Sequence, residues 1–477
     1  MTQYLTNHAK QERRVTAWYD EALRMSTGSC GSVGWRERSV NSEVYCYASE
    51  SVSPLKLGRR RSLMSQKPRT HILIFSLALL AGALAFPMRS SAAPNYTVLH
   101  YFTGADGYGP YGGVTLDQKG NLYGTTAGGG TGECGLYTCG TVFKLTPHQN
   151  GNWTETVVHS FLGGKGDGSD PWSSLIFDEA GHLYGTTVGG GTQFAGVVFE
   201  LTPGRAGWTE HILYSFGAHS NDAYAPSAGP VMDNAGNLYG TGHAAFELIR
   251  GPGVWSERVL HHFCSWPDCR DGGGPFAGLI LDASGNLYGT TAGGGAGCDG
   301  EGCGTVYELT PSADGGWKER VLHDVDNNGK DGVTPGNGAL MMDSSGNLYG
   351  TTESGGCCGG TVFKLTPGTD GHWKETILHN FKPGASGSFP TAGVVMDKAG
   401  NLYGTTVDRG SSCNCGVIYR LTPGSNGKWT YTVLHAFSGG DGAIPAGNLI
   451  LDDKGNLYGG TVLGGDDNDG VIFELTP

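Results

Sequence analysis

Short apolar runs separated by polar turns repeat along residues 95–477. In one copy the runs cover residues 278–282, 286–291, 304–311 and 317–323, and they are named a, b, c and d here in chain order. Gly, Pro, Asn and Asp bound these Val-, Ile-, Thr- and Tyr-rich runs, and no stretch sustains a 3.6-residue period. Each run is therefore predicted to be a short β-strand. Run a is apolar at successive positions, which is typical of a strand buried on both faces.

The segment Gly-Asn-Leu-Tyr-Gly recurs once in each copy and defines one repeated unit. The seven copies begin at Gly120, Gly181 (with His182 in place of Asn), Gly236, Gly285, Gly346, Gly400 and Gly455. Steps of about 50 to 60 residues indicate a repeat architecture, and four-stranded sheets packed around an axis bury their innermost strands. We expect an all-β fold, a seven-bladed β-propeller of four-stranded antiparallel blades over residues 95–477.

The two ends of this region are complementary. Residues 96–102 resemble a strand d with no a, b or c before it, and residues 470–477 resemble a strand c with no d after it. The N-terminal strand is expected to join the last blade and close the ring. Closure would remove the exposed sheet edges that an open array leaves.

The first 93 residues follow a different pattern. Residues 72–86 form an uncharged apolar run, preceded by basic residues and followed by the small residues 90–93. The run is shorter than the roughly 20 residues that span a membrane, so the order indicates a signal peptide over residues 64–93. An uncleaved N-terminal anchor is the alternative. Residues 1–63 are expected to be an unstructured extension, and no transmembrane span is expected after signal cleavage.

Composition and charge narrow the function classes. Gly supplies 84 of 477 residues, which argues against long packed helices because each internal Gly costs about 1 kcal/mol relative to Ala. Residues 94–477 hold 18 of the 31 basic and 38 of the 44 acidic residues. Nucleic acids and anionic membrane surfaces are polyanions, so neither is an expected partner.

The loops divide into two faces, because antiparallel strands alternate in direction. The a–b turns and most c–d turns are uniform and share one face, the turn face. The b–c and d–a loops vary in length and composition and share the other, the variable face. Variable loops on a rigid scaffold are where function usually lies.

Ten cysteines lie in the loops of the variable face as close pairs. The pairs are Cys134/Cys139, Cys264/Cys269, Cys298/Cys303, Cys357/Cys358 and Cys413/Cys415. An even number in an exported chain predicts local disulfides. Metal binding is the alternative, although each loop offers only two thiols and a structural zinc site normally has four ligands.

The variable face is also acidic. Its carboxylates either keep the protein soluble or bind a cation. The best local candidate for a calcium site is Asp324, Asp326 and Asn328, because their spacing resembles the start of a calcium loop. Position twelve of such a loop is Pro335 and not Glu, so an EF-hand is excluded. The alternative is an ordinary acidic turn.

Three residue types recur in almost every unit. Asp ends strand a (Asp117, Asp178, Asp233, Asp282, Asp343, Asp397 and Asp452), His lies in strand d (His100, His159, His261, His323, His379 and His435, with Tyr214 as the exception), and Trp begins strand d (Trp153, Trp208, Trp255, Trp317, Trp373 and Trp429). A residue present in every blade does not mark one active site. The Asp is interpreted as a cap of its own turn and the His as a structural group on the perimeter. The Trp is expected to pack on a neighbouring turn, with a peripheral sugar platform as the alternative.

These motifs resemble a known family. The segment Gly-Asn-Leu-Tyr-Gly-Thr-Thr, the run Gly-Thr-Val-Phe-x-Leu-Thr-Pro at 140–147 and 360–367, and the run Trp-x-x-x-x-Leu-His-x-Phe at 373–381 and 429–437 together resemble the GloVer tandem-repeat (choice-of-anchor) proteins. The resemblance covers residues 95–477 and implies an exported bacterial propeller with no established activity. More distantly, the Asp-x-x-Gly-Asn-Leu-Tyr turn is similar to NHL-type and streptogramin-lyase-like propellers.

The expected function is a rigid binding or interaction module, secreted or in the cell envelope. A surface glycan or protein would contact the b–c and d–a loops of a monomer. The alternatives are a propeller hydrolase or lyase with a metal-assisted axial site, and a purely structural envelope protein. The sequence shows no G-x-S-x-G, H-E-x-x-H or P-loop signature. Polar groups converging on the axis would favour the enzyme, and a Gly-rich or apolar plug would favour the binding module.

Blade three departs from the repeat. Its b–c connection shrinks to residues 242–244, beside His243 and His219 on the variable face. The resulting notch could admit a ligand, or it could reflect simple decay of the repeat.

Overall fold

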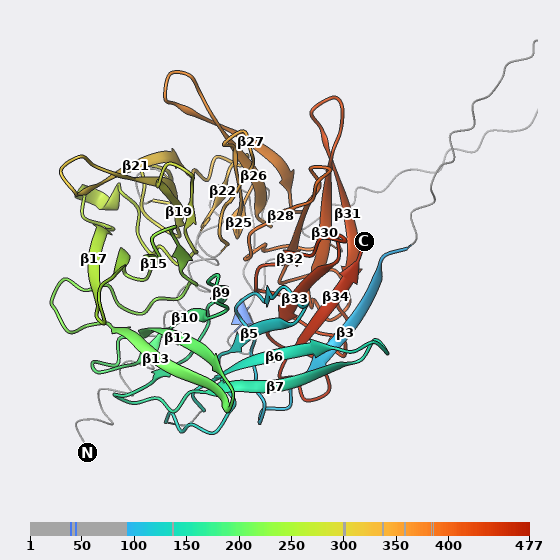
Figure 1. The fold of residues 1–477 in the computed structure, drawn as a ribbon. Coiled ribbons are helices and arrows are strands. Elements are labelled where there is room, and N and C mark those ends of the chain that lie inside the picture. The colour runs from blue at the N-terminus through green and yellow to red at the C-terminus, as the bar shows by residue number, and fades with distance from the viewer. Residues whose placement is uncertain are drawn as a thin grey trace, which may run out of the picture. The chain divides into compact units, whose positions relative to one another are not determined.

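Seven four-stranded sheets surround a central axis in the computed structural model (Figure 1). The structure describes residues 93–477 except 136–137, 299–301, 336–337, 357–358, 383 and 385, together with a ladder of β1 (Ser39–Val40) and β2 (Glu43–Val44). The seven-bladed propeller predicted from the repeat is confirmed. The expected extension at 1–63 and signal peptide at 64–93 lie almost wholly outside the described residues.

Each blade runs from a short inner strand a to a long outer strand d. Blade 1 contains β4 (Thr115–Leu116), β5 (Leu122–Thr126), β6 (Thr141–Pro147) and β7 (Trp153–Ser160); blade 2 contains β9 (Ile176–Phe177), β10 (Leu183–Thr187), β12 (Val197–Gly204) and β13 (Gly207–Ser215); blade 3 contains β14 (Val231–Met232), β15 (Leu238–Thr241), β16 (Ala244–Arg250) and β17 (Trp255–His262); blade 4 contains β18 (Ile280–Leu281), β19 (Leu287–Thr291), β20 (Thr305–Pro311) and β21 (Trp317–Asp324). Blade 5 contains β23 (Met341–Met342), β24 (Leu348–Thr352), β26 (Thr361–Pro367) and β27 (Trp373–Asn380); blade 6 contains β28 (Val395–Met396), β29 (Leu402–Thr406), β30 (Val417–Pro423) and β31 (Trp429–Ala436); blade 7 contains β32 (Ile450–Leu451), β33 (Leu457–Thr461), β34 (Val471–Thr476) and, as its strand d, β3 (Asn95–Tyr101).

The ring closes through strands from the two ends of the repeat region. Strand β3 pairs antiparallel with β34, from Asn95 opposite Thr476 to Tyr101 opposite Val471. The Tyr96 hydroxyl also donates a hydrogen bond to the Asp441 carbonyl at 2.6 Å. The expected closure by the N-terminal strand is therefore confirmed.

Glycine is required at two positions of the repeated segment, for a different physical reason at each. The first lies in the a–b turn at positive φ, for example +81° at Gly120, where a side chain would be strained. The second lies in strand b under the aromatic ring of strand c: a Cβ on Gly124 would lie 2.5 Å from the Phe143 ring. The Leu between them is fully buried in all seven copies. The segment thus encodes one turn and one packing layer.

The recurrent Asp at the end of strand a caps its own turn, as predicted. In blade 1, Asp117 Oδ1 accepts the N–H groups of Lys119 and Asn121 at 2.8 and 2.9 Å, and Oδ2 accepts the Asn121 amide at 2.6 Å. The same pair of backbone hydrogen bonds recurs in the other six blades. The Asn of the repeated segment therefore serves the turn.

Aromatic contacts join neighbouring blades. The Phe that follows strand d packs on the aromatic residue in strand c of the next blade, as with Phe102 on Phe143 at a 5.2 Å ring separation. The other pairs are Phe161–Phe199, Phe216–Phe246, Phe263–Tyr307, Phe381–Tyr419 and Phe437–Phe473. Between blades 4 and 5 the buried Val325 stands in the place of this Phe. The hydrophobic core is therefore a series of layers between blades.

The variable loops share a common frame. The d–a loop entering a blade pairs with the b–c loop of that blade, as β8 (Gly168–Ser169) with β11 (Gly189–Gly190) and β22 (Gly332–Val333) with β25 (Ser354–Gly355). Single bridges at 108/128, 273/293, 388/408 and 443/463 make the same connection. One short 3-10 helix, η1 (Pro267–Cys269), interrupts a d–a loop. Among the described residues, no helix reaches the length and hydropathy that crossing a bilayer requires.

Deleting residues 95–101 from the full chain tests the role of ring closure. The deletion would leave the outer edge of β34 unpaired and uncover part of the last interblade layer. We expect the melting temperature to fall on the order of 10 °C, measured by calorimetry. Deleting the same number of residues from the segment before residue 93 is the control. Equal melting temperatures for the two deletions would contradict a stabilising role for β3.

Candidate functional sites

Four cysteine pairs on the variable face are disulfide-bonded in the structure. The bonds join Cys134 to Cys139, Cys264 to Cys269, Cys298 to Cys303 and Cys413 to Cys415. The fifth expected pair, Cys357 and Cys358, lies outside the described residues. Each bond spans at most five residues, so it constrains one loop and not the fold.

Exposed hydrophobic side chains gather on successive d–a loops of the variable face. Leu162 is 62% exposed, Tyr224 45% and Trp266 47%, in the loops that follow strand d of blades 1, 2 and 3. The Tyr224 ring stacks on His243 from the shortened b–c connection of blade 3, with 4.5 Å between ring centroids. Burial lowers the pKa of His243, and the nearby His262 adds to this effect. The irregular blade thus presents an ordered aromatic pair to solvent.

The other expected residue of this notch has a local role. His219 donates its N–H to Asp222 within the d–a loop, and the structure records no contact between His219 and His243. An open depression of about 750 Å³ does lie at blades 3 and 4. Val231, Met232, Ile280 and Leu281 and the adjoining a–b turns line it, so it belongs to the turn face.

Small residues line the axis. The segments that precede strand a are 112–114, 173–175, 228–230, 277–279, 338–340, 392–394 and 447–449, and they contain Gly, Ala, Ser, Asn, Pro, Val and Leu only. They approach so closely that a Cβ on Gly112 would lie 2.6 Å from the Ser173 backbone. The Thr125 hydroxyl of strand b donates to the Ser173 carbonyl of the next blade at 2.7 Å. This lining offers no carboxylate or imidazole.

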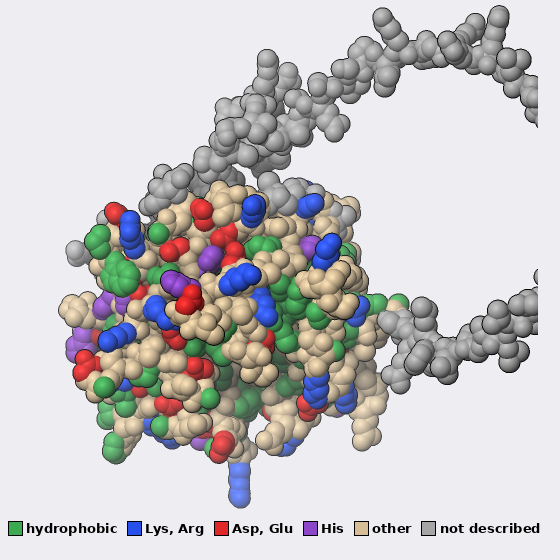
Figure 2. Space-filling view, turned by 90° about the horizontal axis from the view of Figure 1, so that it is seen from above, with side chains coloured by type: hydrophobic (Ala, Val, Ile, Leu, Met, Phe, Trp, Pro, Cys, Tyr) green, Lys and Arg blue, Asp and Glu red, His purple; other side chains and the backbone are tan. Residues whose placement is uncertain are grey.

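Histidine and carboxylate side chains meet between outer strands, at positions we call seams. Each seam can combine three groups: the strand d His or Tyr of one blade, an Asp of the following d–a loop, and a strand d residue of the next blade. The last of these lies two positions after the Trp, or at the equivalent position in β3, which has no Trp. The seven seams are His100/Asp106/Glu155, His159/Asp167/Glu210, Tyr214/Asp222/Glu257, His261/Asp271/Glu319, His323/Asp331/Glu375, His379/Tyr431 and His435/Asp441/Tyr96. The expected perimeter histidines are therefore interblade groups, and Figure 2 shows one side of the ring where His, acidic and basic side chains are interspersed.

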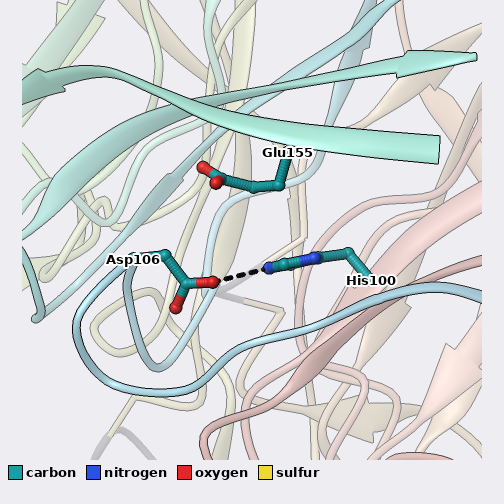
Figure 3. Close-up of side chains that lie close together, drawn as sticks. All are labelled: His100, Asp106 and Glu155. Carbon is teal, nitrogen blue, oxygen red and sulfur yellow. Dashed lines mark hydrogen bonds and ion pairs between the residues drawn. The ribbon is translucent and has the colours of Figure 1, made fainter.

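The first seam shows the basic geometry (Figure 3). His100 Nε2 lies 2.9 Å from Asp106 Oδ2, and Asp106 Oδ1 accepts the Thr103 N–H at 2.9 Å. Glu155 approaches from β7 of blade 1. Burial raises the pKa of Glu155 to about 7, and the Asp106 charge adds to the shift. Hydrogen bonds from its own loop thus satisfy Asp106, whereas Glu155 has no cationic partner among the described residues.

These glutamates were not among the residues predicted from the sequence. Their signal is the Trp-x-Glu spacing in strand d of five blades, with Tyr431 and Tyr96 at the equivalent positions of the other two. Where Tyr replaces Glu, its ring stacks on the seam His: Tyr431 on His379 at 4.2 Å and Tyr96 on His435 at 3.8 Å. A neutral ring thus fills the space that a carboxylate occupies elsewhere. Burial lowers the pKa of His379 to about 4, with Lys382 adding to the effect.

The Trp that begins strand d packs on the preceding blade. Trp208 meets the Tyr123 ring edge-on at 5.9 Å, and Trp153, Trp317 and Trp373 make the corresponding contacts with Tyr458, Tyr239 and Tyr288. These partners lie in strand b, beside the a–b turn. The expected packing of Trp on a neighbouring turn is therefore confirmed for Trp153, Trp208, Trp317 and Trp373.

One further cluster lies on the turn face of blade 2, where His182 replaces the repeated Asn. His182 Nδ1 lies 3.2 Å from Asp178 Oδ2 and 2.9 Å from Glu200 Oε1. The Tyr184 hydroxyl is within hydrogen-bond distance of both carboxylates, at 3.1 and 2.8 Å. Tyr184 therefore contacts both acids of this cluster, while His182 Nδ1 is buried without a hydrogen-bond partner.

The calcium candidate Asp324, Asp326 and Asn328 is engaged in local hydrogen bonds. Asp324 Oδ1 accepts the Ala296 N–H and Asp326 Oδ1 accepts the Cys298 N–H. Asn328 Oδ1 accepts two N–H groups of its own turn. This arrangement is what an acidic turn requires, and calcium binding here stays a prediction.

Comparison with known proteins gives one family and several distant structures. A family model described as the Gloeobacter/Verrucomicrobia repeat matches residues 82–251, 133–314 and 244–473. No curated protein matches significantly. One similar structure is PorZ, described as an essential bacterial surface component of the type-IX secretion system of Porphyromonas gingivalis, with 16% identity and a TM-score of 0.47, covering 79% of this chain and 47% of that chain.

Two further structures are similar in the same distant way. A protein provisionally named 6-phosphogluconolactonase from Bacteroides uniformis has 14% identity and a TM-score of 0.42, covering 68% of this chain and 84% of that one. A protein provisionally named oxidoreductase (glucose dehydrogenase) from Thermus thermophilus has 16% identity and a TM-score of 0.37, covering 64% and 96%. None of these likenesses bears on function.

Glu319→Gln tests the unpaired seam glutamates. Both Glu319 carboxylate oxygens are buried without a hydrogen-bond partner, and burial, with Asp271 and Asp324 nearby, raises its pKa to about 7 from 4.5. The folded state therefore keeps a proton that the unfolded state loses, so this contribution to stability declines as the pH rises from about 4.5 to about 7. In metal-free buffer, urea unfolding is expected to show a smaller loss of stability between pH 5 and 8 in the variant than in the wild type. The exposed Glu133→Gln is the control, and parallel pH profiles for Glu319→Gln and the wild type would refute the prediction.

Proposed function

The chain belongs to the Gloeobacter/Verrucomicrobia repeat family, and from this membership and the closed ring we propose that it is an exported binding module. It acts at or outside the cell surface as a monomer, and its ligand contacts the b–c and d–a loops. Export is supported by the signal-peptide pattern at 64–93 and by four disulfides, which persist in oxidising compartments.

The exposed aromatic pair Tyr224–His243, with Trp266 on the next d–a loop, is the observation that carries the proposal. Side chains of this size are usually buried, and an aromatic ring with a polar edge suits contact with a ligand that is partly apolar and partly hydrated. The loops also carry Asp222 and Asp268, whose oxygens can accept hydroxyl hydrogen bonds. A surface glycan combines apolar ring faces with hydroxyl groups and fits this chemistry best.

The residues that line the axis favour a binding module over a hydrolase or lyase. The inner segments contain Gly, Ala, Ser, Asn, Pro, Val and Leu, and they bring no carboxylate or imidazole to the axis as general acid or base. The Asn448 side chain, the most polar group there, accepts the Gly393 N–H at 2.8 Å. A purely structural envelope role would leave the aromatic residues of blades 2 and 3 without a ligand.

Replacing Tyr224 and Trp266 by Ala, singly and together, tests this proposal. Each ring is expected to contribute about 1.4 kcal/mol, so each single variant should bind a surface polysaccharide roughly tenfold more weakly. The measurement is titration calorimetry on polysaccharides first selected by a glycan-array screen with the wild type. Val254→Ala is the matched control, because Val254 is 71% exposed on the opposite, turn face.

Two outcomes would contradict the proposal. One is a wild-type chain that binds no glycan on the array, which would favour a protein ligand or a structural role. The other is wild-type affinity in the Tyr224→Ala, Trp266→Ala double variant with an unchanged melting temperature.

A further inference from the structure

At two seams both carboxylates lie within ion-pair distance of the same histidine. At the seam of blades 1 and 2, Asp167 and Glu210 face the single imidazole of His159; at the seam of blades 4 and 5, Asp331 and Glu375 face His323. Among the ion pairs of the described residues, none brings a Lys or Arg to either group. Two carboxylates beside one imidazole in a largely buried place favour the uptake of a proton or a cation.

The separations between these side chains suit a shared metal ion. His159 Nε2 lies 3.7 Å from Asp167 Oδ1 and 3.5 Å from Glu210 Oε2. Ligand atoms at 2.0–2.2 Å from a tetrahedral zinc ion would be about 3.3–3.6 Å apart. His323 Nε2 lies 3.1 Å from Asp331 Oδ2 and 3.6 Å from Glu375 Oε1, close to the same range.

Unsatisfied atoms at the first of these seams point to a missing partner. His159 Nε2 and Glu210 Oε1 are both buried and make no hydrogen bond. Asp167 is 7% exposed, and its oxygens accept the N–H groups of Leu162 and Gly168, which hold the carboxylate in place. Leaving such buried polar atoms unpaired destabilises the folded state, and an ion between the three side chains would remove that cost.

We propose that His159, Asp167 and Glu210 bind one zinc ion or a similar divalent transition metal, and that His323, Asp331 and Glu375 bind a second. Imidazole nitrogen and carboxylate oxygen are ligands that zinc accepts. Each ion would connect the strand d edges of two blades, β7 with β13 and β21 with β27. Three protein ligands leave a fourth position for water, on the partly exposed outer wall of the ring.

Other clusters differ in ways that exclude them from the proposal. At the seam of His100 and Asp106, Glu155 forms no ion pair with His100, whereas Glu210 and Glu375 lie 3.5 and 3.6 Å from their histidines. The His182 cluster already has the Tyr184 hydroxyl between its carboxylates. The remaining seams either carry Tyr in place of His or Glu, or do not bring the three ligand atoms together in the described structure. The chain therefore contains its own controls.

The test measures zinc bound to the full chain purified without a histidine tag. After equilibration with zinc and removal of the free ion, elemental analysis is expected to show two ions per wild-type chain. Glu210→Gln and Glu375→Gln keep the side-chain shape and should each lose one ion, with at least about tenfold weaker affinity at the altered site. Glu155→Gln and His182→Asn, which restores the residue of the other six repeats, should still bind two.

Thermal melting provides a second readout. Zinc should raise the melting temperature of the wild type and of the two controls, and should have no effect on the Glu210→Gln, Glu375→Gln double variant, whose zinc-free melting temperature reports whether it folds. A wild-type chain that binds no zinc overturns the proposal, as does a folded double variant that still binds two ions. The result is independent of glycan binding, because the seams lie between the outer strands and not in the loops that carry Tyr224 and Trp266.

Discussion

The ring depends on the contact between the hydrophobic side chain that follows strand d of one blade and the aromatic ring in strand c of the next blade. That side chain is Phe at every junction except the one between blades 4 and 5, where it is Val325. A single four-stranded sheet cannot bury its own faces, so each blade is stable only against its neighbours. The second Gly of the repeated segment makes this layer possible, because any side chain on Gly124 would enter the space of Phe143. The blade geometry, the loop positions and the seams all follow from this layer.

Much of the fold could be predicted because the repeat supplies the same information seven times. Strand order, closure and the capping role of Asp117 and its six counterparts depend on local pattern and on the phase of the two ends. The seams could not be predicted in the same way. Glu210 lies two residues after Trp208 in an outer strand, where a lone charged residue ordinarily faces water, and only the placement of the next blade buries it against His159.

The calcium candidate shows a different limit of sequence pattern. Asp324, Asp326 and Asn328 have the spacing of a calcium loop, yet the same spacing suits carboxylates that accept N–H groups of neighbouring loops. Pattern alone does not distinguish the two, since both use oxygen atoms at alternate residues. Likewise, the stacking of Tyr224 on His243 follows from a shortened b–c connection whose path the sequence does not specify.

The closing of the ring by its first and last strands has a consequence for how the chain acquires its structure. Six blades are built from contiguous segments, so they can nucleate in any order once those segments are available. The seventh requires Tyr96 to meet a partner 345 residues later in the chain. The entropic cost of joining ends this far apart grows only slowly with length, but the search delays the step. Until it occurs, an otherwise complete array carries one bare strand edge, and a bare edge of this kind favours aggregation.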